Sequence, residues 1–156
     1  MRGRQFRVPR RVMAVHRVVV ADDDDMMRSA LVDVLRADHR FQVVAAVATG
    51  RGLPDVVARH QADVVLLDVR MEEGGPDAAR RLTSAPEGGP VVIAVSAEVG
   101  TVRVLEMLRA GATGYLAKGR LGGSLPDLVA RCAQGEVLLA VPTASAAVRH
   151  LLASDR

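Results

Sequence analysis

The chain has 156 residues, of which 49% are hydrophobic and 25% are charged, and its formal net charge is +3. This length accommodates one domain with one hydrophobic core, and the high apolar fraction excludes a disordered chain. No apolar stretch approaches the roughly 20 residues of a membrane-spanning helix, and His16 and Arg17 interrupt the run after the basic amino end, which does not suit a secretory signal. We therefore expect a soluble, cytoplasmic protein without a membrane partner.

Positive charge is concentrated at the amino end of the chain. The first twelve residues contain no acid and include Arg2, Arg4, Arg7, Arg10 and Arg11. The remainder is slightly acidic, so the net charge does not predict a nucleic-acid-binding surface on the domain itself. We interpret residues 1–14 as a basic arm that is disordered, that results from a start codon placed upstream of Met13, or that binds an acidic partner.

Apolar runs of strand length alternate with helical patterns along the rest of the chain. The expected strands are residues 17–21, 41–47, 64–67, 91–95 and 113–117. The expected helices begin after Asp25 and after Gly52, and then cover residues 76–82, 99–110 and 124–134. This alternation predicts an α/β fold with a doubly wound parallel sheet, and we expect its strands in the order 2-1-3-4-5.

Four of the five expected strands end in a side chain that can carry chemistry. Asp22 and Asp23 follow the first strand, Asp68 the third, Ser96 the fourth and Lys118 the fifth. Because the first and third strands are neighbours in the expected order, their three carboxylates should converge at one edge of the sheet. Carboxylates so close need a cation, and a few oxygen ligands favour Mg²⁺. A metal, an ammonium group and a hydroxyl around Asp68 predict phosphoryl transfer to its carboxylate.

These residues resemble the motifs of bacterial response-regulator receiver domains, and the likeness covers about residues 15–134. V-V-V-A-D-D resembles the family's acid pair, with Asp23 as the direct Mg²⁺ ligand and Asp22 as the ligand that acts through water. L-L-D-V-R-M resembles the segment that holds the phosphoacceptor, here Asp68, and the metal-binding backbone carbonyl, here that of Arg70. The resemblance implies a flavodoxin-like (βα)5 fold and phosphorylation by a sensor histidine kinase or a phosphotransfer protein.

The fourth and fifth strands carry the rest of this resemblance. V-I-A-V-S-A supplies Ser96, and G-Y-L-A-K supplies Tyr115 and Lys118. The likeness implies that Ser96 and Lys118 bind the phosphoryl group, and that Ser96 and Tyr115 form a switch. Such a domain catalyses only its own phosphorylation and dephosphorylation, so we do not expect an enzyme. Arg70 and Glu98 should flank the mouth of the site, where they either pair and tune the lifetime of the phosphoryl group or stay solvated and independent.

A narrower resemblance is to NarL/LuxR-type regulators, carried by A-G-A-T-G-Y-L-A-K-G and A-Q-G-E-V-L-L-A-V-P-T. In those proteins a linker leads to a helix-turn-helix domain, so we expect residues 135–156 to be a linker and a helix capped by Thr143. The implied output is transcription, through a DNA-binding domain absent from this chain, and a stand-alone receiver is the alternative. The helix around residues 102–108 is apolar on more than one face, which favours a partner surface such as that of a homodimer.

Two departures from the receiver pattern lie in loops. Glu72 stands where the family usually has proline, and Asp24 and Asp25 add carboxylates beside the acid pair. We expect Asp25 to cap the first helix and assign no role to Asp24. The alternatives are an unphosphorylated pseudo-receiver and a haloacid-dehalogenase-like phosphatase. The phosphatase would use Asp22 and Asp24 as its D-x-D motif, but Met26 stands where that motif has Thr or Val.

Overall fold

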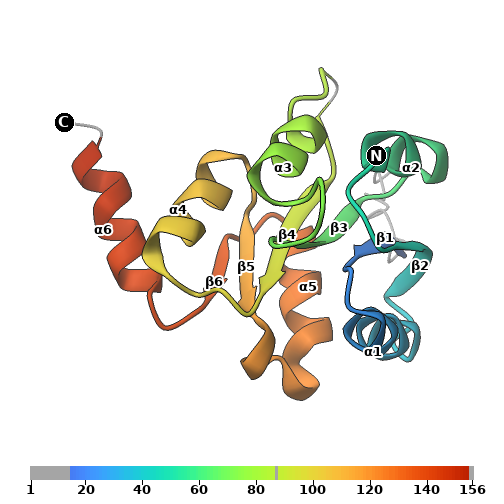
Figure 1. Ribbon diagram of the computed structural model, residues 1–156. Coiled ribbons are helices and arrows are strands. Elements are labelled where there is room, and N and C mark those ends of the chain that lie inside the picture. Colours follow the sequence, from blue (N-terminus) through green and yellow to red (C-terminus); the bar gives the residue numbers. More distant parts are fainter. Residues whose placement is uncertain (1–14, 87, 155–156) are drawn as a thin grey trace, which may run out of the picture.

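The computed structural model describes residues 15–86 and 88–154, and its centre is one sheet of parallel strands (Figure 1). The order of the strands is β2-β1-β3-β4-β5-β6. Their bounds are β1 His16–Ala21, β2 Phe41–Val47, β3 Val64–Asp68, β4 Val91–Ser96, β5 Gly114–Ala117 and β6 Leu138–Ala140. The expected doubly wound, flavodoxin-like order 2-1-3-4-5 is confirmed, and β6 extends it beyond β5.

Helices cover both faces of the sheet. Their bounds are α1 Asp25–Arg36, α2 Leu53–His60, α3 Gly75–Thr83, α4 Thr101–Arg109, α5 Leu125–Ala133 and α6 Ala144–Ser154, with short 3₁₀ turns at Lys118–Arg120 and Gly122–Ser124. Helices α1 and α5 pack on one face, whereas α2, α3 and α4 pack on the other, and α6 lies against α4 (Figure 1). None of the described helices is long and apolar enough to cross a membrane.

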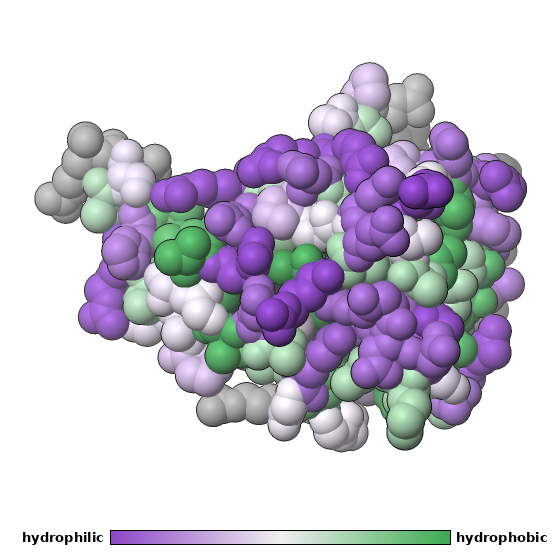
Figure 2. All heavy atoms as spheres, viewed as in Figure 1, coloured by the Kyte–Doolittle hydropathy of each residue, from purple (hydrophilic) through white to green (hydrophobic). Residues whose placement is uncertain are grey.

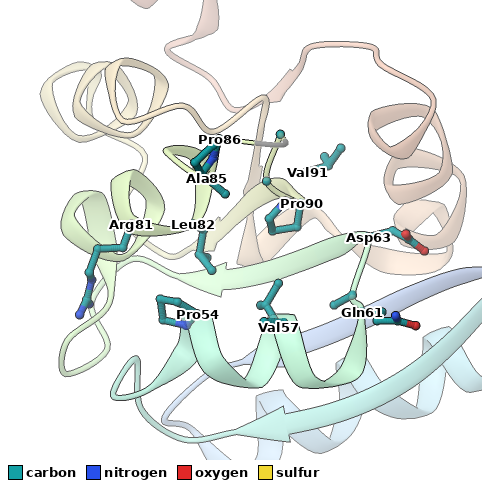
Figure 3. Close-up of a pocket in the computed structure, with 14 residues that line it drawn as sticks. Pro54, Val57, Gln61, Asp63, Arg81, Leu82, Ala85, Pro86, Pro90 and Val91 are labelled. Atoms are coloured by element: carbon teal, nitrogen blue, oxygen red, sulfur yellow. The ribbon is translucent and has the colours of Figure 1, made fainter.

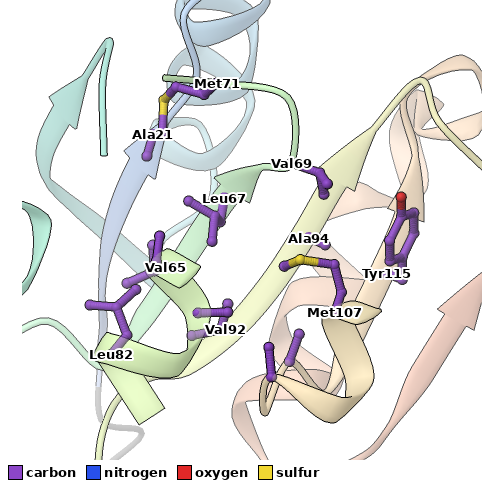
Figure 4. Packing of buried hydrophobic residues seen from close by; sticks show 14 of the residues in the cluster. Ala21, Val65, Leu67, Val69, Met71, Leu82, Val92, Ala94, Met107 and Tyr115 are labelled. Carbon is purple, nitrogen blue, oxygen red and sulfur yellow. The ribbon is translucent and has the colours of Figure 1, made fainter. Parts of the chain in front are cut away.

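The strands form because their side chains alternate between two apolar layers. Val19 and Ala21 of β1 belong to the layer under α2, α3 and α4, whereas Val18 and Val20 belong to the layer under α1 and α5. All five residues of β3 are buried, as expected for a central strand covered on both faces. The core is largely aliphatic, and its aromatic members are Phe41 in the layer under α1 and α5 and Tyr115 in the other layer. The ring of Tyr115 packs beside β4 with its hydroxyl directed toward the carboxyl edge of the sheet (Figure 4).

Helix α1 begins one residue earlier than the sequence suggested. The carboxylate of Asp24 accepts a hydrogen bond from the backbone N–H of Met27 at 3.0 Å, so Asp24 is the N-cap. Asp25 is the first helical residue, and its carboxylate pairs with Arg28. The expectation that Asp25 caps the helix is therefore wrong. Adjacent acids suit the cap equally in the sequence, and only the extended backbone of Asp24 decides between them.

The segment after α5 contributes a strand that we did not expect. Leu138–Ala140 pairs in parallel with β5, so β5 is not the edge of the sheet. The expected helix follows as α6. Thr143 precedes it, but its hydroxyl donates to the backbone carbonyl of Val99 at 2.6 Å and makes no capping bond among the described residues. The prediction that Thr143 caps the helix is therefore wrong. The expected arm, residues 1–14, lies outside the described residues.

Candidate functional site

Three carboxylates meet at the carboxyl edge of the sheet. Ala21 at the end of β1 is paired with Leu67 of β3, so the residues that follow them, Asp22 and Asp68, lie side by side. One carboxylate oxygen from each of Asp22, Asp23 and Asp68 lies within 4.8 Å of the others. Asp22 and Asp68 are only 1% and 4% exposed, whereas Asp23 is exposed. The sequence prediction that these three side chains converge agrees with this geometry.

Lys118 is the cation that faces this cluster. Its Nζ lies 2.9 Å from Asp22 Oδ2 and 3.4 Å from Asp68 Oδ2. Burial opposes the charge of the ammonium group, but the two carboxylates outweigh it and raise the pKa of Lys118. One ammonium does not neutralise two buried acids. Burial, and next the charge of Asp22, raise the pKa of Asp68 to about 6.

The cluster has the properties of a site for a divalent cation. Asp22 Oδ2 is buried, and although Lys118 lies near it, this oxygen receives no aligned hydrogen bond from the described residues. A buried acceptor without a donor is costly, and a cation at this point would satisfy it. The donor atoms are all carboxylate oxygens, which hard cations such as Mg²⁺ prefer. The described residues therefore fit a metal of this class.

Backbone N–H groups orient two of the carboxylates, and one arginine holds the backbone of Asp22. Asp22 Oδ1 accepts a hydrogen bond from the N–H of Asp24 at 2.9 Å, and Asp68 Oδ1 accepts a longer one from Arg70 at 3.3 Å. Arg28 was not identified from the sequence. Its guanidinium donates to the backbone carbonyl of Asp22 at 2.8 Å and pairs with Asp25 at 2.5 Å. Only the i,i+3 spacing of Asp25 and Arg28 could have indicated this arginine.

Ser96 and Tyr115 lie together behind the site. Ser96 is fully buried at the end of β4, and its hydroxyl oxygen accepts a hydrogen bond from the N–H of Glu98 at 3.0 Å. Tyr115 is also fully buried, and its hydroxyl donates to the backbone carbonyl of Glu98. Burial raises the pKa of Tyr115, so it stays protonated and able to donate. Both side chains therefore hold the same residue of the β4–α4 loop.

The carboxylate of Glu98 is shared by two arginines. Arg70 Nε lies 3.1 Å from Glu98 Oε1, and Arg103 Nε lies 2.9 Å from Glu98 Oε2. Arg103 also pairs with Glu106 at 2.9 Å. The Arg70 side chain is 64% exposed and that of Glu98 is 28% exposed, so this pair lies at the surface. Of the two sequence alternatives, the structure has the paired one, and Arg103 is an additional partner.

The loop in which Glu72 replaces proline is fixed by a neighbouring loop. The backbone carbonyl of Glu72 accepts hydrogen bonds from Gly50 N–H at 2.8 Å and from the Thr49 hydroxyl at 3.2 Å. A Cβ on Gly50 would lie 1.8 Å from the carbonyl oxygen of Glu73, so only glycine permits this approach. These contacts stiffen the β3–α3 loop without the ring of a proline.

A separate cavity lies at the opposite edge of the sheet. Its volume is about 760 Å³, and Figure 3 shows it between α2 and the segment that joins α3 to β4. Val57 and Leu82 line its apolar part, and Asp63 lies at its rim, just before β3. Asp68 is at the other end of β3. This cavity is therefore no part of the acidic cluster.

Comparison with known proteins assigns the chain to a family. The family model described as the response regulator receiver domain matches residues 18–130. The chain belongs to this family. The signal receiver domain of the response regulator NarL from Mycobacterium tuberculosis is 31% identical and superposes with a TM-score of 0.74, covering 79% of this chain and 99% of that one. The receiver is thus of the NarL/LuxR type, as the sequence resemblance predicted.

Two curated relatives are longer proteins that contain a region similar to this receiver. A transcriptional regulatory protein of Bacillus subtilis, itself uncharacterised, is 32% identical over 130 residues, which is 83% of this chain and 59% of that protein. A protein-glutamate methylesterase/protein-glutamine glutaminase of Nocardioides is 32% identical over 111 residues, which is 70% of this chain and 30% of that protein. The receiver thus spans only part of the length of these relatives.

Proposed function

We propose that the receiver accepts one phosphoryl group on Asp68 and transmits this event to an output, which we take to be transcription. The donor is a sensor histidine kinase or a phosphotransfer protein of a cytoplasmic two-component phosphorelay. DNA would be bound only through a C-terminal domain outside this chain, and a homodimer is a further expected partner. The observation that carries this proposal is the convergence of Asp22, Asp23 and Asp68 beside Lys118.

Asp68 is the nucleophile in this proposal. One of its carboxylate oxygens attacks the phosphorus in line, and an oxygen–phosphorus bond forms as the bond to the donor nitrogen breaks. The electron pair of that bond stays on the donor imidazole, which takes up a proton. Asp68 must be ionised to attack, and Lys118 favours the ionised form.

The surrounding residues hold the reactants. Asp22, Asp23, Asp68 and the backbone carbonyl of Arg70 would hold Mg²⁺, which supplies charge neutralisation for the phosphoryl oxygens. Lys118 binds one phosphoryl oxygen by its ammonium group, and Ser96 donates its hydroxyl to another. These roles make the domain a catalyst only of its own phosphorylation and dephosphorylation.

The switch in this proposal is Ser96 together with Tyr115. The Ser96 hydroxyl oxygen holds the N–H of Glu98, and Tyr115 holds the carbonyl of the same residue. Donating to a phosphoryl group moves Ser96 toward Asp68, and the Tyr115 ring follows into the vacated space. Phosphorylation would thereby favour a second packing of the β4–α4 loop.

Intact-mass measurement tests the proposal. The protein is incubated with acetyl phosphate and Mg²⁺, and we expect a gain of one phosphoryl group that EDTA prevents and that Asp68→Asn abolishes. Asp33→Asn is the matched control, because it removes an exposed aspartate of α1 that is not part of the acidic cluster.

Three outcomes would contradict this function. If Asp68→Asn gained a phosphoryl group as the parent does, Asp68 would not be the acceptor. If the parent gained the group equally well in EDTA, the reaction would not need a metal. A parent that takes no phosphoryl group from acetyl phosphate or from kinases would be a pseudo-receiver. The phosphatase alternative needs Asp24 as the second aspartate of its D-x-D motif. The Asp24 carboxylate instead caps α1, which argues against that alternative.

A further inference from the structure

The β4–α4 loop is held by three successive hydrogen bonds. Ser96 binds the N–H of Glu98, Tyr115 binds the carbonyl of Glu98, and Thr143 binds the carbonyl of Val99 at 2.6 Å. These three side chains come from β4, from β5 and from the turn between β6 and α6. The residue that would contact the phosphoryl group and the start of the C-terminal helix are therefore joined through two residues of one loop.

Helix α6 covers one side of α4. Ala147 is fully buried in the apolar layer that also contains Tyr115 and Met107, and Leu151 packs against the same layer. At the far end, Arg109 of α4 donates to the Ser154 hydroxyl at 3.4 Å. Figure 2 shows apolar side chains gathered where α6 meets α4, among hydrophilic ones. The apolar contacts of Ala147 and Leu151, with one hydrogen bond at each end, thus hold α6 against α4.

We propose that α6 is a phosphorylation-controlled cover of α4, held by Thr143 while Asp68 is unphosphorylated. This inference rests on the proposed function of Asp68. When Ser96 turns toward the phosphoryl group, its hydroxyl no longer accepts the hydrogen bond from the N–H of Glu98. The β4–α4 loop then shifts, and the carbonyls of Glu98 and Val99 move with it. The bond from Thr143 to Val99 weakens because hydrogen bonds depend steeply on distance and angle. Helix α6 then spends more time away from α4, and the apolar side of α4 becomes accessible.

The coupling must act in both directions. If phosphorylation favours the released position of α6, the released position must favour the phosphorylated state by the same factor. A variant that loosens α6 should therefore shift the protein toward the phosphorylated state. Thr143→Val removes the hydroxyl and keeps the size and branching of the side chain. We therefore expect this variant to bind beryllofluoride, a phosphoryl mimic, with Mg²⁺ at lower concentration than the parent. Thr143 does not touch the acidic cluster, so only a coupled loop gives this result.

Hydrogen exchange with mass spectrometry measures the cover directly. In the parent, amides of residues 144–154 should exchange faster after beryllofluoride and Mg²⁺ are added. In Thr143→Val they should exchange about five-fold faster even without the mimic, since one net hydrogen bond is lost, and the mimic should add less. Ser145→Ala is the matched control, because within residues 15–86 and 88–154 the Ser145 hydroxyl forms a hydrogen bond only with Arg149 of α6 itself. This variant should behave as the parent.

The outcomes separate this proposal from the proposed function. If the parent gains a phosphoryl group but exchange in residues 144–154 does not change, the cover is wrong and the phosphoacceptor stands. If α6 responds in the parent but Thr143→Val exchanges and binds the mimic as the parent does, Thr143 is not the contact that holds the cover. If no phosphoryl group and no mimic binds, both proposals fail. The parent measurement decides even if Thr143→Val does not fold.

Discussion

Asp22 and Asp68 are two almost fully buried carboxylates that share one ammonium group. Burial disfavours their charges, and their mutual repulsion adds to this cost when no metal is bound. The side chains that suit the site for a cation therefore destabilise the metal-free protein. The acidic cluster therefore raises the free energy of unfolding only when a cation is bound.

We predict that Asp68→Asn stabilises the metal-free protein at neutral pH by about 1–2 kcal/mol, because it removes one buried charge. This corresponds to a rise in melting temperature of roughly 3–6 °C. Mg²⁺ should raise the melting temperature of the parent more than that of the variant. Asp33→Asn, an exposed change, should alter neither value. A lower melting temperature for metal-free Asp68→Asn would show that the charge is well compensated.

The same prediction has a pH dependence with a definite sign. The pKa of Asp68 is raised from 3.8 to about 6, so between these values the folded metal-free protein binds more protons than the unfolded chain. The contribution of Asp68 to the free energy of unfolding must then fall as the pH rises through this window, and level off above it. Asp68→Asn removes this contribution. Thermal melts in EDTA between about pH 4 and 7 would measure the difference between the two proteins.

Arg70 and Glu98 follow Asp68 and Ser96 by two residues and form an ion pair at the surface. We predict that this pair lies at the mouth of the site and slows hydrolysis of the phosphorylated protein. The exposed pair contributes little to stability, about 0–1 kcal/mol, yet it can restrict the entry of water in line with the phosphoryl group. Arg70→Ala and Glu98→Ala should each speed dephosphorylation about two-fold to five-fold. Arg103→Ala, which leaves the contact between Arg70 and Glu98 intact, is the control.

The double variant decides whether the pair acts as a unit. If Arg70 and Glu98 close the mouth together, removing both should speed hydrolysis no more than removing either one. Effects that add on the logarithm of the rate would mean that the two side chains act independently. Mass measurement of the phosphorylated fraction against time gives the four rates.

At the scale of one element, the start of α1 depends on the choice between two adjacent acids. Because the Asp24 carboxylate accepts from Met27, we predict that Asp24→Ala lowers the free energy of unfolding by about 1 kcal/mol. Asp24→Asn should retain the cap and most of the stability. Asp25→Ala should cost only a few tenths of a kcal/mol, since it loses an exposed pair with Arg28. Denaturation in EDTA keeps metal binding out of the comparison, and equal losses for both alanine variants would contradict this assignment.

Elements with strong periodicity were predicted well from the sequence, and short or exposed ones were not. Buried β1, β3, β4 and β5 were evident as apolar runs followed by functional residues, and these runs located the acidic edge, Ser96 and Lys118. Strand β6 has three residues, all half-buried, and its pairing with β5 is a tertiary contact that no local pattern reveals. Arg28 was missed for a similar reason, because its bond to Asp22 depends on how α1 turns back over the site.

At the scale of the whole molecule, the C-terminal segment is continuous with the domain. The sequence suggested a receiver of residues 15–134 followed by a linker, but Val141 and Ala147 are buried in the same apolar layer as Tyr115 and Val104. We infer that residues 136–154 fold together with the receiver. The carboxyl edge of the sheet then carries the acidic cluster, and α6 lies against α4, where Thr143 joins it to the β4–α4 loop.

A chain that ends at Gln134 tests this view of the domain. It would leave unpaired the edge of β5 that faces β6, and it would expose the surface of α4 that Ala147 covers, so we predict a loss of about 3 kcal/mol or more in the free energy of unfolding. A chain that ends at Ser154 retains β6 and α6 and is the control. Urea denaturation of both chains measures the midpoint and the slope, and the slope should fall with the smaller buried area. Equal stability of the two chains would mean that β6 and α6 add nothing to the stability of the receiver. They would then be a linker and not part of the domain.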